Sequence, residues 1–483
     1  MIESSLLPHM TGFIGGRWVG ADSGDTLAVH NPANGEKLAD VASMGREETL
    51  RAVAAAQEAL QEPASIDTRR RWLNDIVQAL QDNREEVGRI LTMEHGKPWK
   101  EAQGEVDYAA GFFRYCAEHI DVLQPRVLEE RPKDCTWTVH FRPAGVAGLL
   151  TPWNFPIGMI AKKLSAALAA DTPSVIKPSS KTPLTMIALF ALLEREVKLP
   201  AGKTNLVIGP AGAIGDTLCE DPRVTVMSFT GSTGVGKELI RKTADQVKRL
   251  TLELGGNAPY LVFEGADLDA AADNLIANKF RGGGQTCVCS NRIIVQRSIA
   301  GTFAEKVAER IAGMKVGDGL ESDTDVGPLI DRNGYQKVRR HVQDALQKGA
   351  ERVVGEDPGD LEHDWGAFHP LTVIRGVTGE MLCAKEETFG PLVPIMEFDA
   401  EDEAVHMAND TEFGLAAYLF TGDADQANRV IPRLHFGHVG HNTGTGPTPE
   451  APFGGMLQSG YGREGGLEGL FDYVEPQTVP RGK

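Results

Sequence analysis

Cys287 is the residue whose surroundings point most directly to chemistry. It follows three consecutive glycines at 282–284, and Glu253 lies thirty-four residues before it in a second glycine-containing segment. A thiolate is intrinsically nucleophilic and its pKa can be lowered by local dipoles or cations, while a carboxyl whose pKa is raised by partial burial suits a general base. The two residues together predict covalent catalysis at a carbonyl carbon.

The composition restricts the classes of protein to which the chain can belong. The 483 residues are enough for two or three domains, and 49 Lys and Arg against 67 Asp and Glu give a formal net charge of −18. So acidic a chain argues against nucleic-acid binding, which needs a basic surface. An anionic substrate or cofactor must then be held by a local group of cations.

The cysteines and the apolar runs indicate a reduced protein of the cytoplasm. The six cysteines are too few and too irregularly spaced for a disulfide framework, and the spacing of Cys287 and Cys289 does not match structural zinc ligands. No apolar run approaches the roughly 20 residues that span a bilayer, and residues 1–10 do not resemble a secretory signal. We therefore expect no membrane span and no bound metal.

The apolar pattern divides the chain into regions that must position the reactive residues. Residues 12–43 have the pattern of short strands, and residues 46–120 follow helical spacing that is interrupted near Gly96. Strand-like runs then alternate with helical segments over residues 145–235 and again over 258–435. This alternation predicts two α/β domains, each with a parallel sheet covered by helices.

Seven short motifs in a fixed order extend this interpretation. The series resembles the aldehyde dehydrogenase superfamily from near residue 12 to near residue 475, and the segment QTCVCSNR is most similar to the succinate-semialdehyde dehydrogenase branch. The motifs are TPWNFP (151–156), KPSSKTP (177–183), FTGSTGVG (229–236), LELGG (252–256), GQTC (284–287), EETFGP (386–391) and APFGG (451–455).

The resemblance implies an α/β fold of the aldehyde dehydrogenase type. A Rossmann-type cofactor domain is expected over residues 1–120 and 142–251, and an α/β catalytic domain over 252–435. A small β oligomerisation arm is expected over 121–141 and 455–483. The resemblance further implies that the protein is a homodimer or homotetramer.

The resemblance also implies a role for each reactive residue. Cys287 is the nucleophile, the side-chain amide of Asn154 and the backbone N–H of Cys287 donate to the oxyanion, and Glu253 activates the hydrolytic water. Relatives that transfer the acyl group to coenzyme A lack this glutamate, so its presence favours release of a free acid. From residue type alone, Asn154 is also an ordinary turn residue and Glu253 a helix-cap or ion-pair residue.

A glycine-rich turn indicates where a dinucleotide would bind. Residues 229–236 follow an apolar strand and open a helical stretch, where free N–H groups favour a pyrophosphate, although a plain strand-to-helix turn has the same pattern. Without the resemblance, Lys177 is as well explained as a solvated lysine and Glu387 as part of a surface turn. The resemblance implies NADP or NAD as the cofactor, surrounded by Trp153, Lys177, Ser180, Gly231, Ser232, Leu254, Glu387 and Phe389.

Ser180 bears on the choice between the two cofactors. Three residues after the lysine that contacts the adenosine ribose, family members that prefer NAD often carry an acidic residue, whereas this chain has Ser180 followed by Lys181. Without a carboxylate nothing repels a 2′-phosphate, and a neighbouring ammonium attracts it. We therefore expect NADP to be accepted and favoured.

Three further positions describe the far end of the substrate. Where enzymes for apolar aldehydes commonly carry aromatic residues, this chain has Lys162, Arg281 and Pro447. Arg281 matches an arginine with which succinate-semialdehyde dehydrogenases hold the substrate carboxylate, and a guanidinium suits a carboxylate or a sulfonate. Lys162 stands where those enzymes carry a second arginine, and Pro447 replaces a serine. The pattern predicts succinate semialdehyde, glutarate semialdehyde or a sulfonated aldehyde such as sulfolactaldehyde as the substrate.

The loop before the nucleophile departs from the family pattern. Three glycines stand where relatives have Asn-Ala-Gly or Asn-Thr-Gly, and we expect them to make the free loop more mobile. Cys289 lies two residues after Cys287, which raises the hypothesis that the two thiols form a reversible disulfide under oxidation. Cys289 also fits a small packed residue.

The sequence thus predicts an NAD(P)-dependent aldehyde dehydrogenase that oxidises a small anionic aldehyde to the free acid through a cysteine thioester. A first alternative is an enzyme for aliphatic or aromatic aldehydes, with Lys162 and Arg281 turned to solvent. A second alternative, from a different class, is a non-catalytic redox-sensing scaffold that has kept the fold.

Overall fold

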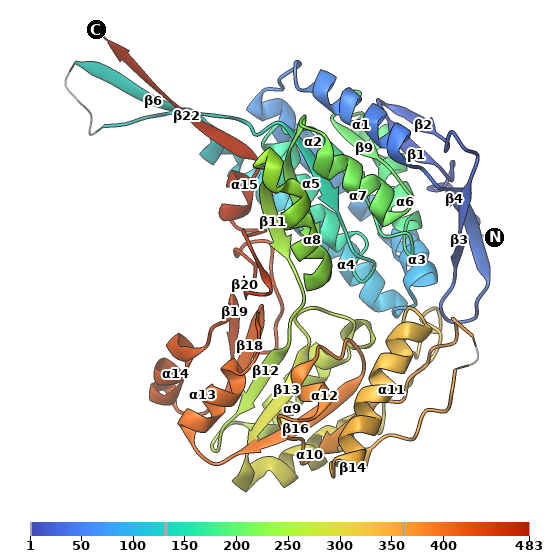
Figure 1. Cartoon of the computed structure of the whole chain (residues 1–483), viewed down its shortest axis with the longest axis vertical. Coiled ribbons are helices and arrows are strands. Elements are labelled where there is room, and N and C mark those ends of the chain that lie inside the picture. The colour runs from blue at the N-terminus through green and yellow to red at the C-terminus, as the bar shows by residue number, and fades with distance from the viewer. Residues whose placement is uncertain (1, 130–133, 362, 483) are drawn as a thin grey trace.

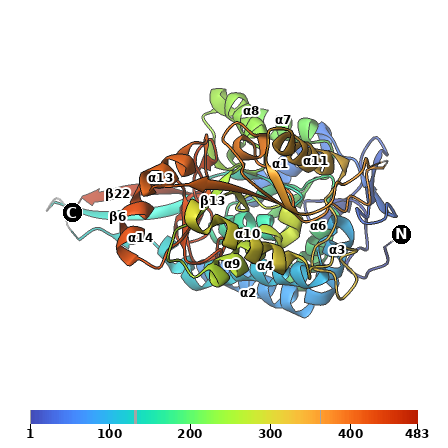
Figure 2. The ribbon, with the colours of Figure 1, turned by 90° about the horizontal axis from the view of Figure 1, so that it is seen from below.

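Two α/β units, each built on its own sheet, make up the body of the molecule, and a long ribbon of strands projects from it (Figure 1). The computed structural model describes residues 2–129, 134–361 and 363–482. In the view from below, the ribbon and the N-terminus lie at opposite ends (Figure 2). The two α/β units confirm the fold class that the strand and helix pattern predicted.

The first sheet uses the strand–helix alternation of residues 145–235. Its five central strands run parallel, while β1 pairs antiparallel at one side and β21 pairs antiparallel at the other. In spatial order the strands are β2 (Arg17–Val19), β1 (Gly12–Ile14), β9 (Thr204–Leu206), β8 (Ser174–Lys177), β7 (Val146–Leu150), β10 (Val224–Thr230), β11 (Arg249–Glu253) and β21 (Gly460–Tyr461).

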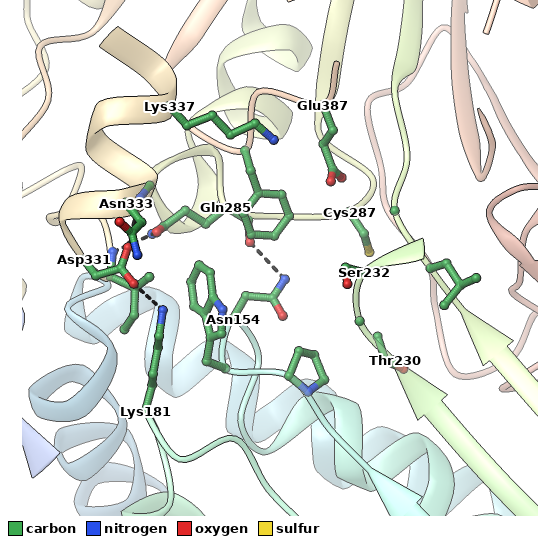
Figure 3. A pocket seen from close by; sticks show the side chains of 18 of the residues that line it. Asn154, Lys181, Thr230, Ser232, Gln285, Cys287, Asp331, Asn333, Lys337 and Glu387 are labelled. Carbon is green, nitrogen blue, oxygen red and sulfur yellow. Dashed lines mark hydrogen bonds and ion pairs between the residues drawn. The ribbon is translucent and has the colours of Figure 1, made fainter. Parts of the chain in front are cut away.

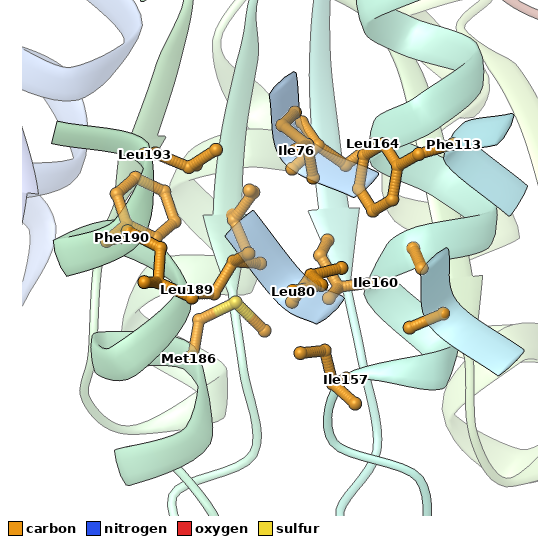
Figure 4. Close-up of a cluster of buried hydrophobic side chains, with 14 of the residues drawn as sticks. Ile76, Leu80, Phe113, Ile157, Ile160, Leu164, Met186, Leu189, Phe190 and Leu193 are labelled. Atoms are coloured by element: carbon orange, nitrogen blue, oxygen red, sulfur yellow. The ribbon is translucent and has the colours of Figure 1, made fainter. Parts of the chain in front are cut away.

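Helices cover both faces of the first sheet, because its parallel strands are apolar on both sides. One face carries α2 to α6, whose buried side chains include Leu164 and Phe190 (Figure 4). The other face carries α1, α7 and α8. The helices are α1 (Arg46–Ala59), α2 (Ile66–Asp82), α3 (Arg84–His95), α4 (Trp99–His119), α5 (Gly158–Ala169), α6 (Leu184–Leu192), α7 (Ala211–Glu220) and α8 (Thr233–Thr243).

The break predicted near Gly96 separates α3 from α4. Gly96 ends α3 in the left-handed conformation, with a φ angle of +92°, and Pro98 immediately precedes α4. Within the described ranges, no helix is long and apolar enough to cross a membrane.

The second sheet is parallel except at β14, and its neighbouring residues alternate between two cores. Ile293 packs with α9 and α10, whereas Ile294 packs with α11 to α14. The strands, in spatial order, are β14 (Glu351–Val354), β15 (Thr372–Arg375), β16 (Leu392–Phe398), β13 (Ser290–Gln296), β12 (Ala258–Val262), β18 (Ala416–Phe420) and β19 (His438–His441). The helices are α9 (Leu268–Lys279), α10 (Arg297–Ile311), α11 (Arg332–Gln347), α12 (Leu382–Lys385), α13 (Glu401–Asn409) and α14 (Ala424–Val430).

The projecting ribbon is made by segments from distant parts of the chain. β22 (Val474–Gly482) pairs antiparallel along the whole of β6 (Cys135–Pro143), and β5 (Arg126–Val127) pairs with the other side of β6. Residues 130–133 of the predicted arm lie outside the described residues. The remaining short elements are β3 (Thr26–His30), β4 (Lys37–Ala42), β17 (Phe413–Gly414), β20 (Met456–Leu457) and α15 (Glu468–Phe471).

Candidate active site

The two sheets bring the predicted nucleophile and base together. Glu253 is the last residue of β11 in the first sheet, and Cys287 lies in the loop before β13 of the second sheet. The thiol of Cys287 donates a hydrogen bond of 3.3 Å to Oε1 of Glu253. Glu253 is buried and Cys287 is half-buried. A thiol and a carboxylate from different parts of the chain thus form a contacting pair.

The three glycines before Cys287 form a left-handed turn. The φ angles of Gly282, Gly283 and Gly284 are +58°, +68° and +77°, a region that favours glycine. A Cβ atom on Gly284 would lie 2.4 Å from the carbonyl oxygen of Gly390. The glycines therefore allow a tight turn and a close backbone approach just before the nucleophile.

Hydrogen bonds hold this turn at both ends. Glu101 of α4 accepts the N–H of Gly282 at 2.7 Å. The side chain of Gln285 donates to the carbonyl of Gly282 and accepts the N–H of Ile330, each at 2.9 Å. The mobility that we expected of the loop stays a prediction, and Glu101 and Gln285 are the contacts that such motion would have to break.

Asn154 reaches the loop of the nucleophile. Its side-chain N–H donates to the carbonyl oxygen of Gln285 at 2.9 Å. The ammonium of Lys97 donates to the backbone carbonyl of Asn154 at 2.7 Å and pairs with Glu105 at 2.6 Å. The buried ion pair of Lys97 and Glu105 thus holds the backbone of Asn154 in place. The side-chain amide of Asn154, the predicted oxyanion donor, is directed toward Gln285, two residues before Cys287.

The electrostatics of the Cys287–Glu253 pair correct our expectation. We expected dipoles or cations to lower the pKa of the thiol, but burial, with the Glu253 carboxylate adding to it, holds that pKa well above its usual value. We expected burial to raise the pKa of Glu253. Burial acts in that direction, but Lys162, whose Nζ lies 2.8 Å from Oε2, together with Lys163 and the Cys287 thiol, brings this pKa below its usual value. Without a substrate, the proton therefore resides on sulfur and the charge on the carboxylate.

Two consecutive buried lysines, Lys162 and Lys163, form ion pairs next to the Cys287–Glu253 pair. The ammonium of Lys162 lies 2.8 Å from Glu253 and 4.0 Å from Glu464, and its side chain is 1% exposed. The ammonium of Lys163 lies 2.5 Å from Glu464 and donates to Ser228 at 2.9 Å. Lys162, which we predicted to hold the tail of the substrate, therefore contacts the predicted base in this structure.

A cavity of about 410 Å³ opens beside the thiol of Cys287, with walls from both α/β units (Figure 3). Its volume is typical of sites for small molecules and cofactors. The structure brings most of the predicted cofactor residues together there, along with the predicted oxyanion donor; these lining residues are Trp153, Asn154, Gly231, Ser232, Leu254, Glu387 and Phe389.

The glycine-rich turn of the first sheet forms one wall. Ser232 is the N-cap of α8, where its hydroxyl accepts the N–H of Val235 at 3.5 Å. A Cβ atom on Gly231 would lie 2.3 Å from the ring of Phe229. A helix N-terminus with free N–H groups at a cavity wall fits a pyrophosphate.

An acidic and an aromatic side chain form the opposite wall. Oε1 of Glu387 accepts the N–H of Gly256 at 3.2 Å, and burial raises the pKa of Glu387 to about 7. The ring of Phe389 meets that of Trp153 edge-on, with centroids 5.6 Å apart. A hydrogen-bond acceptor beside aromatic faces fits a ribose and a flat ring, so the residues present suit a nicotinamide dinucleotide.

Two of the predicted cofactor residues do not line this cavity. Lys177 is buried, its ammonium donates to the carbonyl of Pro178 at 2.8 Å, and burial lowers its pKa to about 8. Ser180 donates to the carbonyl of Gly209 at 3.0 Å and lines a neighbouring cavity of about 370 Å³. Their predicted contact with the adenosine ribose stays a prediction.

Sequence reasoning missed several charged and polar residues of the main cavity. Asp331, Asn333 and Lys337 line it and belong to the start of α11 in the second unit, next to Lys181, which the sequence did indicate (Figure 3). Lys181 forms an ion pair with Asp331. No motif of the series covers residues 331–337, so the sequence carried no signal for them.

A second cavity, of about 220 Å³, contains one of the predicted tail residues in its wall, whereas Lys162 does not line it. Arg281 lines it together with Thr286 and Val288, and so do residues 444–446, which directly precede Pro447. The guanidinium of Arg281 lies 5.0 Å from the ring centroid of Phe155. Arg281 itself is exposed, so it is accessible to a ligand that enters this cavity.

Tyr108 of α4 is a further residue that the sequence did not reveal. Its hydroxyl is buried and has no hydrogen-bond partner among the described residues. Burial raises the pKa of Tyr108 to about 12, and the charges of Lys162, Glu253 and Arg281 act on it as well. A free buried hydroxyl thus lies near both the reactive pair and the predicted tail residues, where a helical pattern shows only another aromatic.

No group of acidic, histidine or cysteine side chains that could hold a metal ion occurs among the described residues.

Comparison with known proteins bears on what this arrangement does. Residues 18–479 match the model of the aldehyde dehydrogenase family. The 3-sulfolactaldehyde dehydrogenase of Pseudomonas putida is 45% identical, over 99% of this chain and 98% of that protein. The NADP(+) succinate-semialdehyde dehydrogenase of Escherichia coli (strain K12) is 42% identical, over 98% of each. A crystal structure of an oxidoreductase from Marinobacter aquaeolei is 63% identical with a TM-score of 0.98, over 100% of each chain.

Proposed function

Since the chain belongs to the aldehyde dehydrogenase family, we propose that it oxidises a small aldehyde with an anionic tail to the free carboxylic acid, with NADP or NAD as the cofactor. One observation carries this proposal: a buried ammonium, that of Lys162, lies 2.8 Å from the base that contacts the nucleophile. A cation so close to the reacting centre suits a short substrate that is charged at its far end.

The first half of the reaction follows from the Cys287–Glu253 contact. Glu253 takes the proton of the Cys287 thiol, and the thiolate adds to the aldehyde carbon. The oxyanion accepts hydrogen bonds from the side chain of Asn154 and the backbone N–H of Cys287, which requires the amide of Asn154 to leave the carbonyl of Gln285. The oxidised cofactor, when bound in the main cavity, supplies the acceptor for the hydride that leaves the substrate carbon.

The second half of the reaction is hydrolysis of the thioester on Cys287. The proton that Glu253 took from the thiol first passes to solvent, so that the carboxylate can act as a base again. Glu253 then takes a proton from water, the resulting hydroxide adds to the thioester carbon, and the sulfur of Cys287 leaves and receives this proton as the acid forms. The contact of 3.3 Å between the two side chains supports both proton transfers by Glu253. A base held this close to the thioester also supports release of a free acid rather than transfer to another thiol.

The tail of the substrate is proposed to meet Arg281 and the ammonium of Lys162, with Tyr108 close to both. A guanidinium binds a carboxylate through two parallel hydrogen bonds and accommodates a sulfonate equally well. The names of the two relatives, one for succinate semialdehyde and one for sulfolactaldehyde, support either tail at similar identity. Pro447, next to the lining residues 444–446, is proposed to shape the entrance without donating a hydrogen bond.

We also propose the predicted division into a cofactor domain, a catalytic domain and an oligomerisation arm, with a homodimer or homotetramer as the assembly. Exposed apolar side chains on and near the ribbon, among them Val127, Leu457 and Phe471, support burial against another subunit. All six cysteines are unpaired, which supports the cytoplasm as the location.

The proposed substrate class is tested by steady-state turnover of succinate semialdehyde, sulfolactaldehyde and hexanal, each with NAD and NADP, for the wild-type protein and Arg281→Ala. We expect an anionic aldehyde to have the highest kcat/KM and Arg281→Ala to reduce that advantage about tenfold or more, because charged hydrogen bonds contribute roughly 1.5–3 kcal/mol. Arg297→Ala is the matched control, since Arg297 is an exposed arginine that pairs with Asp399 and lines neither cavity.

The alternatives predict different results in the same assays. If hexanal is turned over best, or if Arg281→Ala changes neither preference, the enzyme acts on aliphatic or aromatic aldehydes. If no aldehyde is oxidised and Cys287→Ala changes nothing, the protein is a non-catalytic scaffold.

A further inference from the structure

Both oxygens of the predicted base are occupied. Oε1 of Glu253 accepts the thiol of Cys287, and Oε2 accepts the ammonium of Lys162 at 2.8 Å. The side chains of Lys162 and Glu253 are 1% and 3% exposed, so bulk water screens their attraction very little. Once Cys287 carries the acyl group it has no thiol proton to donate, so the contact with Lys162 is the one that remains at the hydrolysis step, where it makes the carboxylate a weaker base.

The ammonium of Lys162 has hydrogen-bond donors left for a second anion. It carries three N–H donors, but Glu253 is its one hydrogen-bond acceptor among the described residues. Its other neighbours are the ring of Phe453, whose centroid is 5.0 Å away, and Oε2 of Glu464 at 4.0 Å. That oxygen and the hydroxyl of Tyr108 are buried without a hydrogen-bond partner in the described part of the chain.

Several titratable groups face Glu253 from the elements packed around it. Lys162 and Lys163 come from α5, Tyr108 from α4, and Cys287 from the loop before β13. Glu464 faces Lys162 from the segment after β21. Lys163 is paired with Glu464, so Lys162 is the cation in direct contact with Glu253. The position of the Lys162 ammonium therefore decides how readily Glu253 accepts a proton.

We propose that Lys162 is a positioning residue that holds Glu253 in an ion pair until the anionic tail of the substrate takes over its ammonium. The tail then has two effects: it anchors the substrate, and it frees Oε2 of Glu253 for the hydrolytic water. This inference rests on the proposed function only in assigning an anionic tail to the substrate.

Because of this coupling, anionic and neutral aldehydes are distinguished at the hydrolysis step as well as at the binding step. A neutral aldehyde acylates Cys287, but leaves Lys162 on Glu253, so that its thioester is hydrolysed slowly. An anionic aldehyde competes for the ammonium at the moment when the base is needed. The carboxylate it releases has lost its nearest cation and is therefore a stronger base.

Ester hydrolysis without any cofactor tests the coupling directly. The acetyl group that p-nitrophenyl acetate leaves on Cys287 has no tail, so a separate small anion can occupy the place of the tail. The steady-state rate after the initial burst is measured from pH 6 to 9 with propionate or methanesulfonate, at constant ionic strength. Dimethyl sulfone serves as the uncharged match of methanesulfonate.

For the wild-type protein, we expect at least one of the two anions to accelerate hydrolysis about threefold or more at pH 8. We also expect this anion to move the acidic limb of the pH profile to higher pH by about one unit. The reason is that a neighbouring opposite charge lowers the pKa of a carboxyl by one to three units, and the anion removes that charge from Glu253. Dimethyl sulfone is expected to change neither the rate nor the limb.

Substitutions at Lys162 separate a positioning role from a structural one. Lys162→Met is expected to show the shifted limb without any added anion and to lose the response to anions. Lys162→Arg is expected to restore both the original limb and the response. Lys163→Met is the matched control, because it removes the adjacent buried ammonium, which pairs with Glu464, and is expected to keep the response.

Two results would overturn the proposal. One is that neither anion changes the rate or the limb of the wild-type protein; the other is that Lys162→Met responds to anions as the wild type does. Failure of the proposed substrate class is distinguishable, because it appears as a preference for hexanal and leaves the ester assay unaffected.

Discussion

The ammonium of Lys181 pairs with the carboxylate of Asp331 across the mouth of the main cavity, joining the two α/β units (Figure 3). Lys181 follows β8 of the first unit, whereas Asp331 is the N-cap of α11 in the second. The lysine that we expected to attract a 2′-phosphate therefore already has a counterion, which weakens its pull on a second anion.

Asp331→Asn is expected to raise the preference for NADP over NAD. Asparagine can keep the helix cap to the N–H of Gly334, but it releases the charge of Lys181. Since Lys181 is partly exposed, we expect a change of about two- to fivefold in the ratio of kcat/KM values, equivalent to roughly 0.5–1 kcal/mol. Lys181→Ala should change the ratio in the opposite direction. Equal effects on both cofactors would show that the ion pair only joins the two units.

Glu253→Gln is expected to separate the two halves of the reaction. The amide cannot take a proton from water, so the thioester on Cys287 should accumulate and steady-state turnover should fall by a factor of about 10² to 10⁴. Rapid mixing with an anionic aldehyde should still give a burst of reduced cofactor, slower than that of the wild type because Glu253 also takes the thiol proton, and mass spectrometry should find the acyl group on Cys287. Unchanged steady-state turnover would exclude Glu253 as the base.

Glu387→Gln is expected to stabilise the protein above neutral pH. Because burial raises the pKa of Glu387 to about 7 from an ordinary value of 4.5, the folded state binds this proton more tightly than the unfolded state does. The stabilisation from that proton is complete below pH 4.5 and is lost as the pH rises through 7, by about 3 kcal/mol. Glutamine remains neutral, so the difference in melting temperature between variant and wild type should be larger at pH 8 than at pH 5. A difference that does not vary with pH would contradict this assignment.

Lys97→Met is expected to destabilise the fold and to lower kcat. Lys97 and Glu105 are both 1% exposed, and removal of the lysine leaves a buried carboxylate unpaired beneath Asn154, at a cost of about 3 kcal/mol. Lys97→Met combined with Glu105→Gln should recover part of the free energy of unfolding measured in urea. Lys37→Met removes one partner of an exposed ion pair and should cost less than about 1 kcal/mol. Similar losses for Lys97→Met and Lys37→Met would show that the buried pair does not support the site.

Cys289→Ser tests the hypothesis of a reversible disulfide. Cys289 is fully buried and its thiol donates to the carbonyl of Lys279, so the loop has to shift before the two sulfur atoms can meet. We expect peroxide to inactivate the wild type in a way that a dithiol reverses, and recovery to be lost in Cys289→Ser because Cys287 is then oxidised further. The hypothesis is wrong if Cys289→Ser shows the same inactivation and the same recovery.

The sequence was most informative about features that depend on residues close together in the chain. Strand and helix periodicity located both sheets, since these periods depend only on neighbouring residues, and the motif series identified the family. The main cavity gathers residues from six of the seven motifs, namely TPWNFP, KPSSKTP, FTGSTGVG, LELGG, GQTC and EETFGP.

The charge of the site could not be predicted, because it depends on how distant segments pack. Lys162 and Glu253 are separated by 91 residues, and nothing in their local patterns shows that α5 places the ammonium against the end of β11. That contact reversed the expected pKa shift of Glu253. Tyr108 and Asp331 were missed for the same reason, since each lies in a helical segment with no motif.

The pairing of β21 with β11 has a consequence for the order of synthesis. Gly460 lies opposite Glu253 in this pair, and the carbonyl of Ser459 accepts the N–H of Leu254. The strand that covers the outer edge of β11, where the base lies, therefore comes from a segment some two hundred residues later in the chain. On the ribosome, both sheets can emerge while β11 still presents an unpaired edge, which is a template for misassociation. Competence for catalysis therefore requires that residues 460–461 have emerged, and a nascent chain that stalls before residue 460 is an aggregation hazard rather than a slow enzyme.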